Sequence, residues 1–290
     1  MPLGSHMSIA GGVYNAIRHG VSAGCEVVQI FTKQPNQWRA KPLTDEEISL
    51  FLSEQKETGV KAACAHNSYL INLASPNDDL WEKSYASMKE EYQRCDTLKL
   101  PNIVMHPGSH VGSGEEAGLK RIGRALNRLF SELLDIKTVV CLEITAGQGT
   151  NLGYRFEHLA KIIDMVEDKN RIGVCLDSCH MFGAGYAMQT EKEYKATMKD
   201  YNNLIGYKYL KVYHLNDSLR PFGQRKDRHE HIGQGMMGIE PFRFIMNDSR
   251  LRRVPMILET PKGPDSKEDI ENMKTLRSLI EVKETQDAVK

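Results

Sequence analysis

The chain has 290 residues, 40% of them hydrophobic and 26% charged, which is typical of a folded globular protein and excludes a wholly disordered one. Lysine plus arginine and aspartate plus glutamate number 38 each, so the formal net charge is zero and bulk charge gives no indication of a nucleic-acid partner. No apolar run approaches the roughly 18 residues needed to cross a bilayer, so we expect no membrane contact.

Cysteine usage and the first residues both indicate a cytoplasmic protein. The six cysteines include no Cys-x-x-Cys pair, and Cys141 and Cys175 lie inside apolar runs, which favours reduced, buried thiols over a disulfide framework. The first residues also lack the basic segment and apolar core of a secretory signal. We therefore expect a reduced interior and a cytoplasmic location.

Short apolar runs alternate with longer amphipathic segments along the whole chain. The runs predict strands buried on both faces, at 3–9, 26–31, 61–66, 102–106, 138–143, 172–177, 209–215 and 255–260. The amphipathic segments predict helices at 11–23, 44–57, 77–98, 114–134, 155–168, 191–205, 239–247 and 266–285.

Alternation of this kind is typical of an α/β fold with parallel strands and right-handed crossovers. Eight strand–helix units in 290 residues fit one (β/α)8 TIM barrel, a single domain covering residues 1–290. A doubly wound open sheet is the alternative, but the first strand–helix turn has no G-x-G-x-x-G fingerprint.

Six successive predicted strands end at or near a residue that can bind a metal. In a parallel barrel those ends meet at one face, where barrel enzymes place their chemistry. A single histidine there would more often be structural, and a single carboxylate would often cap the next helix. Three carboxylates buried together without a cation would be very costly, which favours a metal site. The six residues are His66, His106, Glu143, Asp177, His214 and Glu259.

Three further candidates lie in the segments that follow: His180, and the pair Asp227 and His229. An Asp-x-His pair places both side chains on the same side of an extended segment, so the pair could share an ion with His180. Nine candidates are too many for one ion, and their mixed His and carboxylate character suits zinc or manganese better than calcium or magnesium. A site with two or three such ions is well suited to phosphate-ester cleavage.

The nine candidate ligands and the stretches around them resemble the endonuclease IV family of apurinic/apyrimidinic (AP) endonucleases. The matching stretches run in the family's order over almost the whole chain. They are GSHMSIAGG (4–12), IFTKQPNQW (30–38), HNSYLINLASP (66–76), HPGSH (106–110), LEITAGQGTNLG (142–153), GVCLDSCHMFGAGY (173–186), HLNDS (214–218), DRHEHIGQG (227–235) and ILET (257–260).

The resemblance implies a TIM barrel with three Zn²⁺ ions, with Mn²⁺ possible at some sites. His66 and His106 would bind the first ion, and Glu143 would bridge it to a second. The second would also take Asp177, His214 and Glu259, and the third would be held by His180, Asp227 and His229. Glu143 and Glu259 are the implied catalytic residues.

The implied reaction is hydrolysis of the phosphodiester on the 5′ side of an abasic site in double-stranded DNA. It leaves a 3′-hydroxyl and a 5′-deoxyribose phosphate, and the family also cleans blocked 3′ ends. The implied DNA contacts are Gln37, Tyr69, Leu70 and Asn36, although Asn36 departs from a pattern that has arginine there. Family members act as monomers, and a bacterial member would be associated with the nucleoid.

Two other functions compete with this interpretation. A metal-dependent sugar isomerase or epimerase uses the same barrel, but it would leave the group of His180, Asp227 and His229 idle. A protein that binds damaged DNA without cutting it would be favoured by loss of a ligand, and all nine candidate ligands are present.

Overall fold

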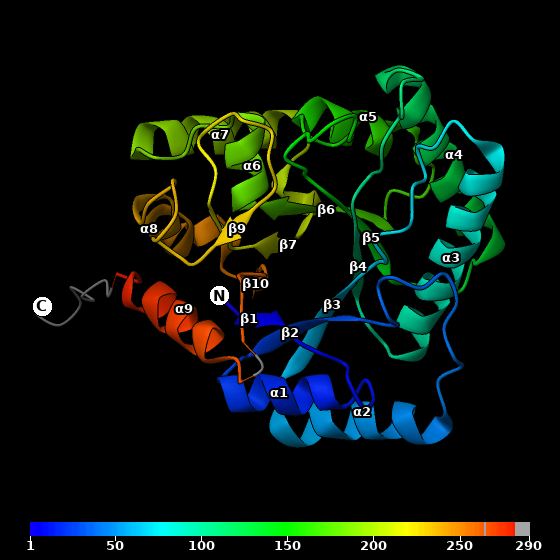
Figure 1. The fold of residues 1–290 in the computed structure, drawn as a ribbon, viewed down its shortest axis with the longest axis horizontal. Helices are drawn as coiled ribbons and strands as arrows, with labels where there is room; N and C mark the ends of the chain where they lie inside the picture. The colour runs from blue at the N-terminus through cyan, green and yellow to red at the C-terminus, as the bar shows by residue number, and fades with distance from the viewer. Residues whose placement is uncertain (264, 282–290) are drawn as a thin grey trace, which may run out of the picture.

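The computed structural model describes residues 1–263 and 265–281. Eight parallel strands form a closed barrel in the order β1-β10-β7-β6-β5-β4-β3-β2 (Figure 1). The predicted TIM barrel is confirmed, and the open sheet is excluded because β1 pairs with both β2 and β10. The strands are β1 Leu3–His6, β2 Val27–Phe31, β3 Lys61–His66, β4 Asn102–Met105, β5 Val139–Glu143, β6 Ile172–Asp177, β7 Leu210–His214 and β10 Met256–Leu258.

Eight α-helices match the predicted ones and lie outside the barrel (Figure 1). They are α1 Asn15–Ala23, α2 Asp45–Thr58, α3 Asp78–Thr97, α4 Glu115–Glu132, α5 Phe156–Met165, α7 Glu191–Leu204, α8 Glu240–Asn247 and α9 Lys267–Ser278. The last helix ends at Ser278, before the predicted end: residues 279–281 are not helical, and positions 282–285 lie outside the described residues. Among the helices that are described, none is long and apolar enough to span a membrane.

The chain also forms short elements that the sequence pattern did not predict. They are α6 Ser178–Ala184, the 3-10 helices η1 Tyr207–Tyr209 and η2 Ser249–Leu251, and a hairpin of β8 Asp217–Ser218 with β9 His229–Glu230. Both α6 and the hairpin follow strands at the end of the barrel that carries the candidate ligands.

Helix boundaries follow local backbone chemistry. The first helix begins at Asn15 rather than residue 11, because Gly11 and Gly12 take positive φ angles of 80° and 132° that a helix cannot contain. The second helix begins as predicted after Thr44, where the Thr44 hydroxyl accepts from the Glu47 amide and the Glu47 carboxylate accepts from the Thr44 amide.

The barrel interior holds a small cluster of buried apolar side chains, here called the inner cluster. It includes three of the six cysteines, all of which are buried free thiols, as expected. On six strands, one member stands two positions before a candidate ligand. Because side chains alternate along a strand, each of these ligands lies on the inner side of its strand, one layer above the cluster. The cluster is Val27, Ala63, Cys64, Val104, Cys141, Cys175, Val212 and Ile257.

Candidate metal centre

The structure brings the nine candidate ligands together in three groups at one end of the barrel. Within each group, the ligand atoms lie within 4.8 Å of one another. The groups are His66–His106–Glu143, then Glu143–Asp177–His214–Glu259, and His180–Asp227–His229, and a fourth set that meets the same distance, Asp177–Cys179–His229, overlaps two of them. The first three are the same sets that the family resemblance implied.

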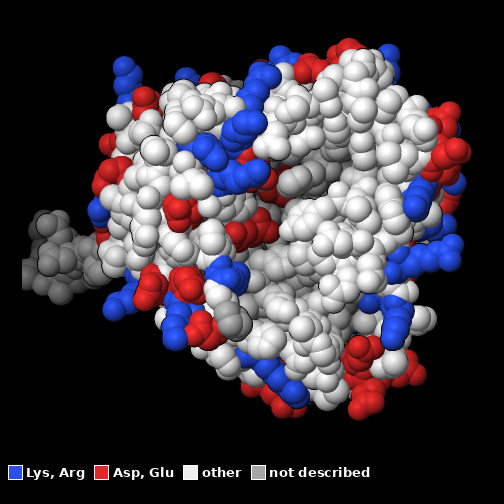
Figure 2. All heavy atoms as spheres, viewed as in Figure 1, with Lys and Arg blue, Asp and Glu red and all other residues white. Residues whose placement is uncertain are grey.

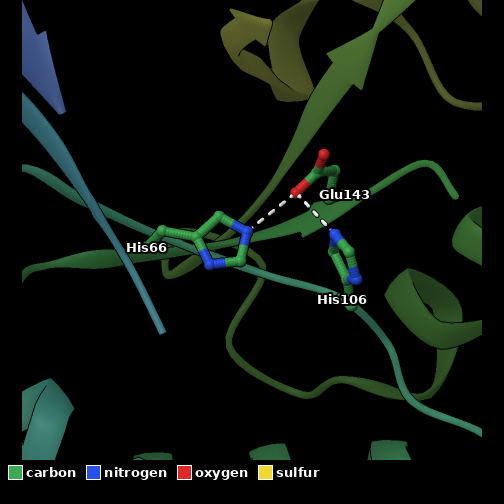
Figure 3. Close-up of side chains that lie close together, drawn as sticks. All are labelled: His66, His106 and Glu143. Atoms are coloured by element: carbon green, nitrogen blue, oxygen red, sulfur yellow. Dashed lines mark hydrogen bonds and ion pairs between the residues drawn. The ribbon is translucent and has the colours of Figure 1, made fainter. Parts of the chain in front are cut away.

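The first group is formed by the ends of three consecutive strands, β3, β4 and β5. Figure 3 shows both imidazoles directed at one carboxylate oxygen. Oε2 of Glu143 lies 3.1 Å from Nε2 of His66 and 3.3 Å from Nε2 of His106. Glu143 is fully buried, whereas the His106 side chain is 35% exposed, so the group opens toward solvent on the His106 side.

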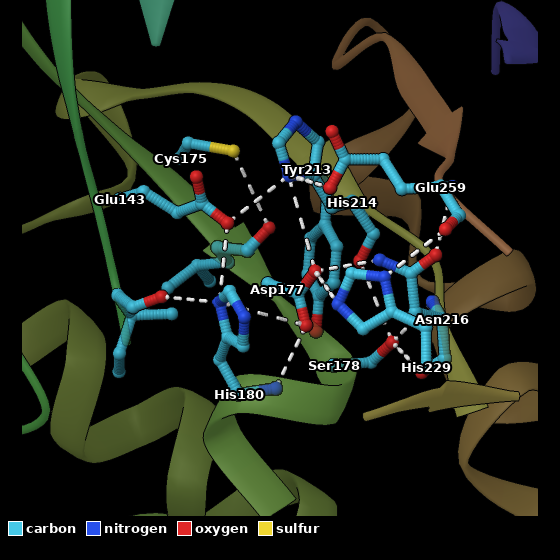
Figure 4. Close-up of polar contacts among 12 residues, drawn as sticks. Glu143, Cys175, Asp177, Ser178, His180, Tyr213, His214, Asn216, His229 and Glu259 are labelled. Carbon is cyan, nitrogen blue, oxygen red and sulfur yellow. Dashed lines mark hydrogen bonds and ion pairs between the residues drawn. The ribbon is translucent and has the colours of Figure 1, made fainter. Parts of the chain in front are cut away.

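The second group shares Glu143 and adds the ends of β6, β7 and β10. Nδ1 of His214 lies 3.2 Å from both Glu143 Oε1 and Glu259 Oε2, and 3.8 Å from Asp177 Oδ2 (Figure 4). Asp177 has two roles, because its Oδ1 also accepts the His180 amide (2.7 Å) as the N-cap of α6. Asp177 therefore caps α6 and is also a member of the second group.

The third group depends on the two elements that were not predicted. Helix α6 positions His180, and the β8–β9 hairpin brings Asp227 and His229 over the barrel. Asp227 lies between the two imidazoles, with its oxygens 3.2 Å from His180 Nε2 and 3.3 Å from His229 Nε2.

The ring protons of three histidines face away from the other members of their groups, as those of metal-binding histidines commonly do. Nδ1–H of His66 donates to the Asn67 carbonyl (2.8 Å), that of His180 to the Ile144 carbonyl (2.8 Å) and that of His229 to the Glu259 carbonyl (3.1 Å). In the neutral form of each ring, Nε2 then carries a lone pair.

Each of these lone pairs faces a carboxylate oxygen, which is itself a hydrogen-bond acceptor. Nε2 of His180 and of His229 is buried without a hydrogen-bond partner among the described residues, and each faces the Asp227 carboxylate. An acceptor that faces another acceptor at about 3 Å needs a proton or a cation between them, and with neutral rings these residues fit a divalent cation.

The pKa shifts of the buried groups also indicate that positive charge is needed beside the carboxylates. Burial alone would raise the pKa of Glu143, but the positive charge of the surrounding histidines, His214 first, holds it well below its usual range. Burial likewise opposes charge on His214, yet Glu259 and Glu143 raise its pKa to about 9. Without metal, protons on the histidines neutralise the buried carboxylates, and a bound cation would take over that role.

A pocket of about 260 Å³ opens above the three groups and is here called the metal pocket. Six of the candidate ligands line it, together with His6, Phe31, Tyr69 and Lys262. Figure 2 shows this face of the molecule hollowed, with acidic atoms in the hollow and Lys and Arg side chains beside it. The neutral net charge thus conceals an uneven local distribution.

The candidate DNA contacts lie on two adjacent loops, which are joined by a hydrogen bond from the Ser68 hydroxyl to the Pro35 carbonyl. Tyr69 is 65% exposed and lines the pocket, with its ring 5.4 Å from that of Phe31. Leu70 is half-buried, and Asn36 and Gln37 are exposed on the neighbouring loop.

A buried ion pair joins these two loops. Lys33 Nζ lies 3.4 Å from Glu91, and both side chains are almost fully buried. Lys33 donates to the carbonyls of Gln37 and Trp38, and Glu91 accepts the amide of Ser68 (3.1 Å). Both loops are therefore attached to α3 through one pair of charges.

The sequence interpretation missed two polar residues of the ligand layer. Strands β1 and β2 contribute His6 and Gln29 there, so every strand of the barrel supplies a polar side chain. Gln29 stands two positions after Val27 of the inner cluster, the same offset as the six strand-end ligands. That offset is the signal that could have identified it.

Asn216, immediately after β7, contacts two candidate ligands. Its amide nitrogen donates to Asp177 Oδ2 (2.6 Å), and its oxygen accepts the backbone amide of Glu259 (2.8 Å). We expect Asn216→Leu to lower metal affinity by about 10- to 100-fold, because partners that orient ligands typically contribute this much. Zinc release to a chromophoric chelator measures it, and Asn203→Leu on the exposed face of α7 is the matched control. Equal release from both variants would show that Asn216 only builds the loop.

Comparison with known proteins identifies the family. A family model described as xylose isomerase-like TIM barrel matches residues 17–279. The chain is 50% identical over 279 residues to the probable endonuclease 4 of Chloroflexus aggregans, covering 96% of this chain and 98% of that protein. The chain belongs to the endonuclease IV family.

Solved structures agree with membership of the endonuclease IV family. Endonuclease IV from Thermus thermophilus superposes with a TM-score of 0.84 at 33% identity, covering 96% of this chain and 98% of that one. The E. coli 3-keto-D-glucoside 4-epimerase superposes with a TM-score of 0.68 over 96% of this chain and 99% of that one. At 14% identity, the second likeness shows the barrel fold alone.

Proposed function

We propose that this chain is a metal-dependent AP endonuclease of base excision repair. It hydrolyses the phosphodiester 5′ to an abasic site in double-stranded DNA and leaves a 3′-hydroxyl and a 5′-deoxyribose phosphate. The proposal rests on one observation: three groups of histidines and carboxylates share one pocket in a member of the endonuclease IV family. The enzyme acts as a single-domain monomer in the cytoplasm, on the nucleoid if the source is bacterial.

The nine grouped residues are proposed as ligands of three Zn²⁺ ions, with Mn²⁺ able to replace zinc at some sites. Divalent ions in such a site lower the pKa of water and neutralise negative charge on a phosphate. Glu143 and Glu259 are the proposed catalytic carboxylates. Glu143 belongs to two groups, and Glu259, 19% exposed, lines the metal pocket where the reacting atoms would lie. The same site would also remove blocking groups from 3′ ends.

DNA contact is assigned to the two adjacent loops, one of which carries Tyr69 at the metal pocket. Tyr69 and Leu70 are proposed to wedge into the minor groove, and Gln37 and Asn36 to fill the gap at the abasic site. Unstacking a base step costs a few kcal/mol, and least where a base is already missing. This difference would favour damaged over intact DNA.

The test is incision of an end-labelled duplex that carries one abasic analogue, in magnesium-free buffer, by the protein as purified. We expect a single cut 5′ to the lesion, with a 3′ end that a DNA polymerase extends. Prolonged chelation should abolish the cut, because the candidate ligands would lose their ions, and added zinc should restore it.

An intact duplex with full metal occupancy would refute the proposal. Tight retention of that intact duplex would then indicate a damage-binding protein. Turnover of ketose or aldose sugars instead would indicate an isomerase or epimerase.

A further inference from the structure

Gln29, in the middle of β2, sits between two candidate ligands, and its amide orientation follows from their chemistry. Its amide nitrogen lies 2.5 Å from Glu259 Oε1. A carboxylate can only accept hydrogen bonds, so the NH2 group must face Glu259 and the amide oxygen must face the other way.

The amide oxygen of Gln29 fixes the proton of His214. It lies 2.8 Å from Nε2 of His214, and the thiol of Cys64 also donates to it (3.1 Å). Because this oxygen only accepts, the proton of a neutral His214 ring, the form that binds a metal, lies on Nε2 and leaves Nδ1 with a lone pair. Nδ1 is the atom that faces Glu143 and Glu259, where the second group would hold a metal.

The amide nitrogen of Gln29 fixes the proton of His6 in the same way. Nδ1 of His6 lies 3.0 Å from it and must accept, which places the His6 proton on Nε2. The His6 ring packs against Phe31 with centroids 4.4 Å apart, and the residue lines the metal pocket beside Lys262. Lys262 Nζ donates to the His6 carbonyl (2.7 Å) and so fixes the end of β1.

We propose that His6 contacts the substrate by donating its Nε2–H to a phosphate oxygen of DNA in the metal pocket, and that Gln29 is the positioning residue that sets the protons of His6 and His214. The identity of the substrate rests on the proposed function. The Gln29 amide thus orients the ring proton of a candidate metal ligand, His214, on one side and that of the phosphate donor, His6, on the other.

The role proposed for His6 is tested by incision kinetics, with zinc content measured on the same samples. His6→Phe keeps the packing against Phe31 but removes the donor, so kcat/KM should fall about 10- to 100-fold, as for a hydrogen bond to a charged group. Zinc per chain should stay at the wild-type value. His6→Gln, which can still donate, should recover most of the loss. Unchanged kcat/KM in His6→Phe, or a loss in proportion to lost zinc, would overturn the assignment.

The role of Gln29 is tested by zinc release, which needs no DNA, and by kcat/KM. Gln29→Met removes both partners and should release zinc about 10- to 100-fold faster to a chelator than the matched control Gln93→Met on the exposed face of α3. Gln29→Glu keeps the acceptor for His214 but cannot donate to His6. It also places a second carboxyl group about where the amide nitrogen stands, 2.5 Å from Glu259 Oε1, so it should lose zinc affinity as well as kcat/KM. Equal zinc release from Gln29→Met and its control, or wild-type kcat/KM in Gln29→Glu, would contradict the role.

Nuclear magnetic resonance of the zinc-loaded wild-type protein, labelled with ¹⁵N-histidine, makes the test independent of variant folding. The His6 signal should show a protonated Nε2 and an unprotonated Nδ1, and a proton on Nδ1 would refute the inference. Failure of the wild-type enzyme to incise the abasic duplex would instead refute the proposed function, while the spectrum and zinc release still decide the role of Gln29.

Discussion

Glu143→Gln is expected to reduce incision of the abasic duplex on the order of 10³-fold or more, with the fold intact. Glu143 lies within 3.3 Å of His66, His106, His180 and His214, and it belongs to two of the three candidate groups. Loss of a single preorganised electrostatic contact typically costs 10²- to 10³-fold, and this carboxylate joins two groups. The measurement is the single-turnover rate on the duplex, with zinc analysed on the same sample.

The control for this variant is Glu157→Gln, which makes the same chemical change on the exposed face of α5. It should cut at the wild-type rate. If Glu143→Gln also cut within a few fold of wild type while folded, the carboxylate would not join two metal sites and the catalytic assignment would fail.

Lys33→Met is expected to destabilise the protein by about 3–5 kcal/mol at pH 8, because it leaves Glu91 buried without its partner. The loss should be clearly smaller at pH 5.5. Burial already raises the pKa of Glu91 to about 7 with Lys33 present, and removal of that cation raises it further. The charged form of Glu91 is therefore penalised in the folded state above this pKa, and at pH 5.5 the group is protonated and neutral. Urea denaturation at the two pH values measures the difference.

Two further variants complete this experiment. Lys120→Met, on the exposed face of α4, should have little effect at either pH. Adding Glu91→Gln to Lys33→Met removes the titrating group and should abolish the pH dependence. A loss of equal size at pH 5.5 and 8 would show that Glu91 does not titrate in this range. Lys33→Met should also weaken binding of the abasic duplex, because both candidate DNA-contacting loops lose an anchor on α3.

The barrel could be predicted from the sequence because its strands are short, continuous apolar runs, whereas its outer helices are longer amphipathic segments. The sequence interpretation missed α6 because six of that helix's seven residues are buried, so Ser178–Ala184 has no polar face to reveal a helical repeat. The β8–β9 hairpin was missed because two-residue strands are too short for an alternating pattern.

The nine candidate ligands could be selected from their positions at strand ends, but their partners could not. Gln29 was missed because an amide inside an apolar run resembles an interruption of the strand. The ion pair of Lys33 with Glu91 joins a loop to a helix far along the chain, and no local pattern connects them. Such contacts depend on tertiary packing, which places side chains together without a periodic signal.

The pairing of β1 with β10 also governs when the site can form as the chain is made. Ser5 and Leu258, which share a hydrogen bond across this seam, are 253 positions apart in the sequence. Contacts of such long range form late in folding, because a long loop must close before they contribute. Glu259 follows β10 directly, so a ribosome must synthesise the chain through residue 259 before the second group can assemble. A nascent chain that has not yet reached β10 therefore has neither a closed barrel nor the second group.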